Sequence, residues 1–449
     1  MDYLLTRAEV DGERINIVGT SGGGFQAAQI AALDKRIKVV VRSCYITALP
    51  MRIFNRIFAD PDSDPEQDLF GMISNGVDHP GLLLLIYSRP MMVAASVLDF
   101  FPIEGTHKTF HEVREMFERF NHGDRVALVE SYNAHQFSLE NQESAIDFLD
   151  HFNHLPVRHG LPAVKKLEDK ALQCSRTGQE MLDFDDAKPL MDVIAKYYDQ
   201  HKNAHAGTLA QNYFSDGHSG VNKWQVAEYM GVQPAKGWIS WEFRGTTTAG
   251  NVSIDRYLLR HSGQLEMPLV HFHYSAKGKR DLLLWFGDDG KATSENWGEI
   301  KEFLDANYDV ISIDFRGLGE TKMPYKAISP DDPAMAQLDF DQAYVYPLSS
   351  VLAGYVYNSI LTGRPYFLQL IEDAEIAARF ADEKFRVRVA AVTALGNAYT
   401  LASAISETLP NIKLLARTDG VVLKWSEIVR QRREIWPIQY LMPSGAYIH

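Results

Sequence analysis

A serine set between glycines is the first group whose type and spacing could do chemistry. Residues 19–23 read Gly-Thr-Ser-Gly-Gly and match G-x-S-x-G, with Ser21 at the centre. An apolar strand is expected directly before this turn, over 14–18, and a helix of small residues directly after it, over 25–32. This strand–turn–helix context is typical of a nucleophile elbow, a sharp turn that exposes the serine Oγ. The competing interpretation is a glycine-rich turn that binds an anion at a helix N-terminus.

A second near-match, Gly217-His-Ser219-Gly220-Val221, lacks the final glycine and follows no apolar strand. Small polar and glycine residues between periodic segments are typical of loops. We therefore expect Ser219 to lie in a loop without a catalytic role.

An elbow serine needs an acid and a histidine, which follow it along the chain in that order. Asp99 comes at the end of the strand expected from Met91, and His135 comes shortly after the strand expected over 125–131. Strand ends of a parallel sheet face one crevice, so we predict a triad of Ser21, Asp99 and His135. In it the imidazole accepts the serine proton and the carboxylate holds the imidazole tautomer. Glu104, in the following loop, is the rival acid.

The other histidines between residues 100 and 155 are expected to be ordinary loop histidines. They are His107, His111, His122, His151 and His154.

An ester hydrolase also needs two donors for the oxyanion. The backbone N–H of Gly22 is the first, and the second normally comes from a loop after an earlier strand of the same domain. No such strand precedes Ser21. The corresponding loop occurs only in the second half of the chain, over 286–290, where Gly287 is the candidate donor.

The elements that must position these residues fall into three parts. Residues 1–155 alternate strand and helix, which predicts a mostly parallel sheet with helices on both faces. Residues 156–235 are irregular and are interpreted as a connector. Strand patterns restart in 236–449, with strands expected at 238–243, 252–259 and 268–274 and a long helix at 366–380.

The two ends of the chain resemble one another. Residues 14–42 and 386–418 both follow a pattern of strand, tight turn, small-residue helix and strand, and Ser21 aligns with Leu395. Self-similarity at a long period indicates duplicated units. Leucine has no attacking atom, so the second unit is predicted to be degenerate. The first copy lacks strands before its turn, and the second stops before any counterpart of Asp99 or His135, so each unit is expected to be incomplete.

The charge, the apolar runs and the cysteines of the sequence limit the kinds of partner that the protein is expected to have. The 449 residues carry 45 basic and 58 acidic side chains, a net charge of −13, which disfavours nucleic acid as a partner. No apolar run approaches the roughly 20 residues that a bilayer requires, and the N-terminal residues lack the features of a signal peptide. Cys44 and Cys174 are interpreted as free buried thiols. No cofactor is expected, and the compatible assemblies include a homo-oligomer.

Three further patterns do not reach a functional prediction. His271 and His273 alternate on one strand face as a metal pair, but no third ligand is evident, so no metal site is predicted. Gly317-Leu-Gly319 lacks the rest of a dinucleotide fingerprint. The aromatic strands around Asp255-Arg-Tyr257 suit sugar binding, but such strands are more often core.

The chain resembles the acetyl xylan esterase-like α/β-hydrolases. The resemblance rests on the Ser21 turn, on segments 99–106 and 133–135, and on the later segments 177–183 and 314–321. These hydrolases are neighbours of the prolyl-oligopeptidase hydrolases, and the resemblance is closest to bacterial tandem members with one active and one degenerate domain. It implies a serine esterase acting on acetylated carbohydrate with Ser21, Asp99 and His135 as its triad. Family members are often exported. The alternatives are a prolyl-oligopeptidase-type peptidase and a non-catalytic carbohydrate-binding remnant.

Overall fold

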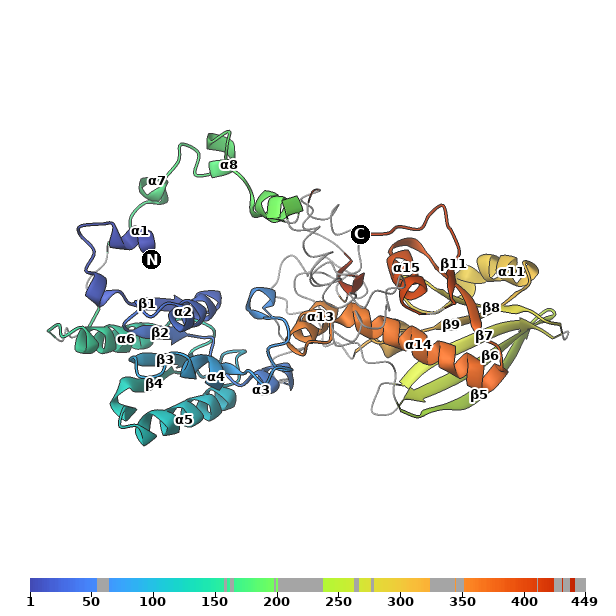
Figure 1. Cartoon of the computed structure of the whole chain (residues 1–449), viewed down its shortest axis with the longest axis horizontal. Coiled ribbons are helices and arrows are strands. Elements are labelled where there is room, and N and C mark those ends of the chain that lie inside the picture. Colours follow the sequence, from blue (N-terminus) through green and yellow to red (C-terminus); the bar gives the residue numbers. More distant parts are fainter. Residues whose placement is uncertain are drawn as a thin grey trace, which may run out of the picture. The chain divides into compact units, whose positions relative to one another are not determined.

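The chain divides into two units, each built around its own β-sheet (Figure 1). Unit 1 comprises Met1–Leu172 with Leu361–Gly363, and unit 2 comprises Gln173–Ile360 with Arg364–His449. The structure is a computed structural model. The residues that it describes are 1–54, 64–156, 160–161, 165–197, 199–200, 237–261, 266–275, 278–323, 344, 351–409, 411–423, 430 and 437–440.

Unit 1 contains a four-stranded sheet in which all neighbouring strands are parallel. Its strands lie side by side in chain order: β1 (Ile17–Thr20), β2 (Val40–Ser43), β3 (Met91–Ser96) and β4 (Val126–Ser131). The runs are short and largely apolar, although β2 also contains the buried polar residues Arg42 and Ser43. β2 and β3 are buried along their whole length, as strands covered on both faces must be. β1 pairs with β2 alone and forms one edge of this sheet.

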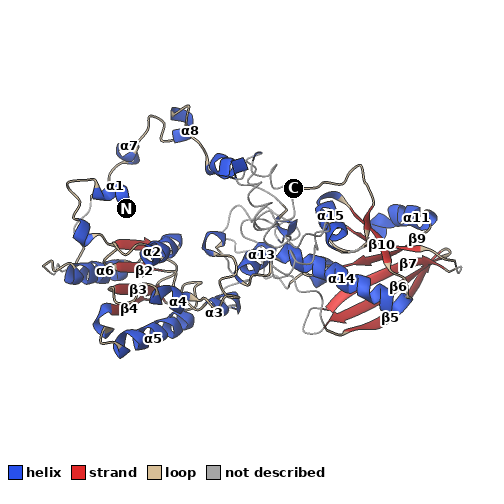
Figure 2. Ribbon diagram, in the orientation of Figure 1, coloured by secondary structure: helices blue, strands red, loops and turns tan. Residues whose placement is uncertain are grey.

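Helices cover both faces of the unit 1 sheet (Figure 2), as predicted. Alternate residues of a strand point to opposite faces. Val40 accordingly packs in the cluster formed with three helices, whereas Val41 packs against a fourth. The first three helices are α2 (Gly22–Leu33), α4 (His79–Leu84) and α5 (Ile103–Arg119), and the fourth is α6 (Leu139–Phe152).

The same unit also contains the short helices α1 (Asp2–Leu5) and α3 (Leu49–Phe54). Two four-residue helices, α7 (Asp169–Leu172) and α8 (Glu180–Asp183), lie in the stretch interpreted as a connector. Most of the rest of that stretch, including the Ser219 near-match, lies outside the described residues.

Unit 2 contains a seven-stranded mixed sheet in the order β11-β10-β8-β9-β7-β6-β5. The three strands expected at its start are present and form an antiparallel meander. They are β5 (Ile239–Ala249), β6 (Val252–His261) and β7 (Glu266–Tyr274). The other four pair with one another in parallel: β8 (Asp281–Phe286), β9 (Tyr308–Ile313), β10 (Val389–Ala394) and β11 (Lys413–Leu414).

Helices again lie on both faces of this sheet. α14 (Tyr366–Phe385) and α15 (Tyr399–Thr408) pack in one cluster with β8, β9 and β10, and α11 (Trp297–Asp305) packs on the other side. The long helix expected at 366–380 is α14, which continues to Phe385. α13 (Val351–Leu361) precedes it. Over the described residues, no helix is both long and apolar enough to traverse a bilayer.

The segment that follows β9 carries a buried ionic network rather than a nucleotide loop. Asp314 is 1% exposed and accepts hydrogen bonds from the backbone N–H of Lys291 and of Glu320 at 2.8 and 3.1 Å. A Cβ at Gly319 would lie 2.0 Å from the Asp314 carboxylate, so this position requires glycine. Gly319 therefore lies against the carboxylate, and Gly317 takes a positive φ of 78°, so each glycine has a structural cause that involves no dinucleotide.

The two predicted turns share their neighbours but differ in conformation. β1 is followed at once by α2, whereas β10 is followed by a short 3₁₀ turn, Gly396–Ala398, and only then by α15. Leu395 has φ −82° and ψ 148°, an ordinary extended conformation, and Gly396 takes the positive φ of 54°. Ser21 itself has φ 56°. The two similar segments, 14–42 and 386–418, thus share the order of their elements, but the aligned residues Ser21 and Leu395 differ in backbone conformation.

Candidate active site

Ser21 occupies a strained turn between β1 and α2. Its φ of 56° and ψ of −120° are rare for a residue with a side chain. Two backbone hydrogen bonds fix the turn: the Ser21 N–H donates to the carbonyl of Ser43 at 2.9 Å, and the Ser21 carbonyl accepts from the N–H of Phe25 at 3.0 Å. The hydroxyl does not cap the helix that it precedes. Such strain persists where surrounding structure enforces it, and it is concentrated at functional sites.

The glycines around Ser21 are not equivalent. A Cβ on Gly19 would lie 2.0 Å from the carbonyl oxygen of Gly23, and one on Gly24 would lie 2.9 Å from Cβ of Tyr45. A Cβ on Gly23 would meet nothing within 4 Å. Close packing of α2 against β1 and β2 therefore requires glycine at 19 and 24, whereas the last glycine of G-x-S-x-G has no steric cause here.

Asp99 and His135 meet at the ends of neighbouring strands. Asp99 follows β3 and His135 follows β4, and the imidazole Nδ1 lies 2.8 Å from the carboxylate Oδ1. Asp99 is 3% exposed, and its Oδ1 also accepts the backbone N–H of Phe101 at 3.1 Å. The His135 ring stacks on Phe100 with centroids 4.4 Å apart. The hydrogen bond and the stacking together fix the ring, with Nε2 on the edge away from Asp99.

The structure thus brings together the predicted acid and the predicted base. Ser21 directly follows β1, which lies two strands away from β3, at the same carboxyl-terminal edge of the parallel sheet. Glu104, the rival acid, is an exposed residue in the first turn of α5. His107 lies in α5 rather than in the expected loop, and it pairs with Glu130 at the surface.

Cys44 is a neighbour of this pair that the sequence analysis did not place there. It follows β2, is 4% exposed, and its thiol donates to the carbonyl of Gln136 at 3.2 Å. Ligand atoms of Cys44, Asp99 and His135 all lie within 4.8 Å of one another. Burial raises the pKa of the thiol, so the group stays protonated at neutral pH. The strand-end rule that selected Asp99 and His135 would have found Cys44 as well.

The other cysteine differs from the expectation. Cys174 is exposed, so only one of the two free thiols is buried.

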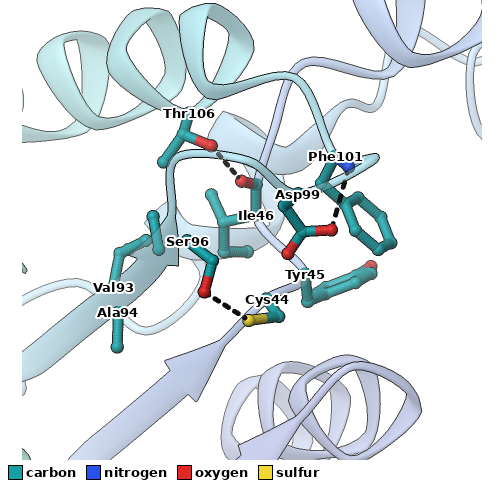
Figure 3. Close-up of a pocket in the computed structure, with 10 residues that line it drawn as sticks. Cys44, Tyr45, Ile46, Val93, Ala94, Ser96, Asp99, Phe101 and Thr106 are labelled. Atoms are coloured by element: carbon teal, nitrogen blue, oxygen red, sulfur yellow. Dashed lines mark hydrogen bonds between the residues drawn. The ribbon is translucent and has the colours of Figure 1, made fainter. Parts of the chain in front are cut away.

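A small cavity lies beside the Asp99 carboxylate (Figure 3). Its volume is about 210 Å³, including space open to solvent, and its lining includes Cys44, Ser96, Asp99 and Thr106. Asp99 Oδ2 is buried and has no hydrogen-bond partner among the described residues. In Figure 3 the dashed line from Phe101 reaches the other carboxylate oxygen, Oδ1. Among the described residues, Oδ2 of Asp99 thus has no hydrogen-bond donor, and the Asp99 side chain lines the cavity.

Gly22 and Gly287, the two candidate oxyanion donors, lie in different units and in different surroundings. Gly22 is the first residue of α2, where the backbone N–H has no acceptor within the helix. Gly287 directly follows β8, and its N–H donates to the carbonyl of Gly290 at 2.8 Å. In this conformation the Gly287 amide is already engaged in its own turn.

Asp255 is a further residue whose placement the sequence analysis missed. It lies opposite His271 in the pairing of β6 and β7, on the strand face shared by His271 and His273. Only the register of the two strands reveals this third ligand-type side chain, and patterns along a single strand do not fix that register.

Comparison with known proteins gives partial similarities. No protein-family model matches the chain. The curated protein named "Putative hydrolase YtaP" from Bacillus subtilis (strain 168) is 26% identical over 153 residues, which are 33% of this chain and 49% of that protein. The chain thus spans about half the length of this curated relative.

Among solved structures, an acetyl xylan esterase from Thermoanaerobacterium sp. JW/SL YS485 is 15% identical with a TM-score of 0.28, covering 43% of this chain and 55% of that one. A carbohydrate esterase family 15 glucuronoyl esterase from Caldicellulosiruptor kristjansonii is 17% identical with a TM-score of 0.28, covering 36% and 49%. Parts of this α/β chain are therefore similar to a hydrolase, to an acetyl xylan esterase and to a glucuronoyl esterase.

Proposed function

We propose that this chain is a serine carboxylester hydrolase that removes acetyl groups from acetylated carbohydrate. The observation that carries the proposal is the 2.8 Å hydrogen bond between His135 and the buried Asp99, at the sheet edge where the strained Ser21 turn also lies. Such a constellation suits acyl transfer, in which a serine is activated by a histidine that a carboxylate orients.

The proposed reaction has two steps. Ser21 Oγ attacks the acetyl carbonyl carbon while His135 Nε2 takes the hydroxyl proton. The ester C–O bond then breaks, the sugar hydroxyl leaves with the proton from His135, and the acetyl group stays on Ser21. Water attacks this acyl-enzyme with His135 again as the base, which releases acetate and restores the serine. Asp99 holds Nδ1–H throughout and stabilises the imidazolium that forms.

The oxyanion that develops in each step needs backbone donors. We assign the Gly22 N–H to this role because it stands at the N-terminus of α2 directly after the nucleophile. Removal of one such donor typically lowers the rate by about 10²–10³-fold. We assign no oxyanion role to Gly287, which lies in the other unit and whose N–H already donates to the carbonyl of Gly290.

Unit 2 has no nucleophile at the position aligned with Ser21. Leu395 stands there in an extended conformation, and its side chain packs against the cluster around Leu283 and Trp285. We therefore propose a structural or substrate-binding role for unit 2.

The test is acetate release from acetylated xylan by the full chain and by three variants. Ser21→Ala should abolish release. Asp99→Asn should lower kcat by on the order of 10⁴-fold, because it favours the wrong imidazole tautomer. Glu104→Gln is the matched control for the rival acid and should leave the rate unchanged. Loss of activity in Glu104→Gln but not in Asp99→Asn would overturn the acid assignment, and full activity in Ser21→Ala would overturn the nucleophile.

Two further measurements separate the alternatives. Cleavage of an aminoacyl-anilide without acetate release would indicate a peptidase of the prolyl-oligopeptidase type. A fluorophosphonate probe should label the native chain and fail to label Ser21→Ala. Absence of labelling in the native chain would instead support a non-catalytic carbohydrate-binding remnant.

A further inference from the structure

Three metal-ligating side chains gather on one face of the unit 2 sheet, far along the chain from the Ser21 turn. Asp255 lies on β6, and His271 and His273 lie two residues apart on β7. Asp255 stands directly opposite His271 in the antiparallel register. Each residue offers one ligand atom, and these atoms lie within 4.8 Å of one another. The sequence showed no third ligand-type residue for His271 and His273, and the folded sheet places Asp255 beside them.

The two imidazoles are held side by side. Their rings stack with centroids 4.6 Å apart and an angle of 21° between the planes. The ring of Phe385, the last residue of α14, packs against His271 with centroids 4.3 Å apart. Both rings are therefore ordered before any ligand binds, which lowers the entropic cost of coordination.

Hydrogen bonds orient the donor atoms as they do in metal sites. Nδ1 of His273 lies 3.2 Å from the backbone carbonyl of Tyr274, and its Nε2 lies 3.2 Å from Oδ2 of Asp255. Oδ1 of Asp255 accepts a hydrogen bond from the Thr246 hydroxyl at 2.5 Å. A metal-ligating histidine typically donates its other N–H to a carbonyl, and a ligating carboxylate is itself hydrogen-bonded. The second oxygen of Asp255 and the Nε2 of His273 then face each other as ligands.

His271 carries an unsatisfied polar atom at this place. The residue is 7% exposed, and its Nδ1 is buried with no hydrogen-bond partner among the described residues. Buried polar atoms without a partner are rare in folded proteins and call for an explanation. A cation held by the cluster supplies one.

We propose that Asp255, His271 and His273 bind a Zn²⁺ ion. Two imidazole nitrogens and one carboxylate oxygen are donors that zinc accepts, and three protein ligands leave a fourth position for water. Donors bound at about 2.0–2.2 Å in tetrahedral geometry lie roughly 3.3–3.6 Å apart, so ligand atoms that now lie within 4.8 Å of one another need to approach by at most about 1.5 Å. The side chains of Asp255 and His273 are 18% and 27% exposed, which gives an ion access from solvent. This site would function independently of the proposed ester hydrolysis.

The test is calorimetric titration of the full chain with Zn²⁺, with Co²⁺ as a spectroscopic probe of four-coordinate geometry. We expect one site with micromolar or tighter affinity. Asp255→Asn and His273→Gln, both at partly exposed positions, should weaken it by at least tenfold and reduce the visible absorption of bound Co²⁺. Circular dichroism of each variant checks that unit 2 remains folded.

Cys44→Ala is the matched control, because the cluster of Cys44, Asp99 and His135 also places metal-binding atoms within 4.8 Å of one another. This variant should keep the tight zinc site. The proposal is overturned if Asp255→Asn and His273→Gln bind zinc as the native chain does, if Cys44→Ala abolishes the tight site, or if the native chain binds zinc no more tightly than millimolar.

Discussion

Ser21 holds a conformation that a residue with a side chain adopts only under constraint. A φ of 56° costs on the order of 1–3 kcal/mol. The cost is met by packing at the start of α2, where glycine backbone lies against glycine backbone, and by the two hydrogen bonds of the turn. The degenerate turn has no such need, and Leu395 takes an ordinary φ of −82°. The strain is thus confined to the turn whose side chain can react.

The two glycines of the motif provide a matched pair of substitutions. Gly19→Ala should destabilise unit 1 by about 2 kcal/mol or more, because its Cβ would lie 2.0 Å from backbone that cannot move without distorting the turn. Gly23→Ala should be neutral or slightly stabilising, since its Cβ would meet nothing within 4 Å and alanine favours the helix. Urea unfolding of both variants measures the difference. Equal stability of the two would show that the turn tolerates a displaced α2.

Residue types and strand ends sufficed to predict Asp99 and His135 as partners, because both follow apolar strands of a parallel sheet. The same strand-end rule applies to Cys44, which directly follows β2, but it was not used there because a lone cysteine carries no motif. Reasoning from the sequence also missed Asp255, because the contact between Asp255 and His271 depends on a register across two strands. Pairing of distant side chains is set by turn geometry and packing, which local patterns do not encode.

At the scale of single elements, the N-terminus of α4 contains a buried neutral histidine. His79 is 1% exposed, and its Nδ1 lies 2.9 Å from the backbone N of Thr47. The pKa of His79 is lowered to about 3, mainly by burial and to a smaller extent by the nearby Arg52 guanidinium. The unfolded chain binds the proton near pH 6.5. Stability from this group is therefore present above pH 6.5 and is lost as pH falls towards 3.

We expect the free energy of unfolding of unit 1 to fall by up to about 1.4 kcal/mol per pH unit from this residue between pH 6 and 4. His79→Gln removes the titration and should give a shallower dependence on pH over the same window. His111→Gln, at a surface position paired with Glu115, is the control and should keep the native slope. Denaturation curves at several pH values measure both, and parallel slopes in all three proteins would contradict the assignment.

The loop after β9 is tied to α14 by a buried ion pair. Arg316 and Asp373 are 6% and 4% exposed, with Nη2 of the arginine 2.6 Å from Oδ1 of the aspartate and its backbone N–H 2.9 Å from Oδ2. Asp373→Ala leaves a buried guanidinium without its main partner and should cost about 3–5 kcal/mol. Glu383→Gln, which removes an exposed partner of Arg379, should change stability by less than about 1 kcal/mol. Thermal unfolding compares the two, and similar midpoints would show that solvent reaches Arg316.

Strands and helices were predictable where apolar runs are short and bounded by turn residues, as in β2, β3 and the meander of unit 2. Element ends were less so: β5 continues to Ala249, beyond its last expected residue, Phe243. A bulge between Phe243 and Gly245 accommodates this extension, and hydrophobic periodicity does not reveal a bulge. The Leu395 turn also differs from its expected form, because side-chain packing rather than the local pattern selects its backbone angles.

At the scale of the whole molecule, the two sheets differ in what flanks the corresponding strands. β10 lies between β11 and β8, whereas β1 has β2 on one side only. Val18 in β1 is 45% exposed, as expected of an edge strand. Among the described residues, β1 is thus an edge strand that contains no buried residue.

Hydrogen exchange should reveal this edge. The N–H groups of Ile17 and Ser21 donate to the carbonyls of Val39 and Ser43 at 3.0 and 2.9 Å, and the intervening Val18 and Thr20 amides alternate away from β2. We expect the Val18 and Thr20 amides to exchange at least tenfold faster than that of Ile17, because only the latter is hydrogen-bonded within the sheet. Equal protection, measured by NMR, would mean that another segment pairs along β1.

One of the two thiols is exposed and the other is buried, so their alkylation rates can be compared within one chain. Cys174 is exposed and meets an alkylating reagent without any opening of the fold, whereas Cys44 is buried beside Asp99 and reacts only while that region is open. Both reactions occur in one chain under one set of conditions. The ratio of the two alkylation rates, corrected for the raised thiol pKa of Cys44, therefore reports the fraction of time for which the surroundings of Asp99 are open to solvent.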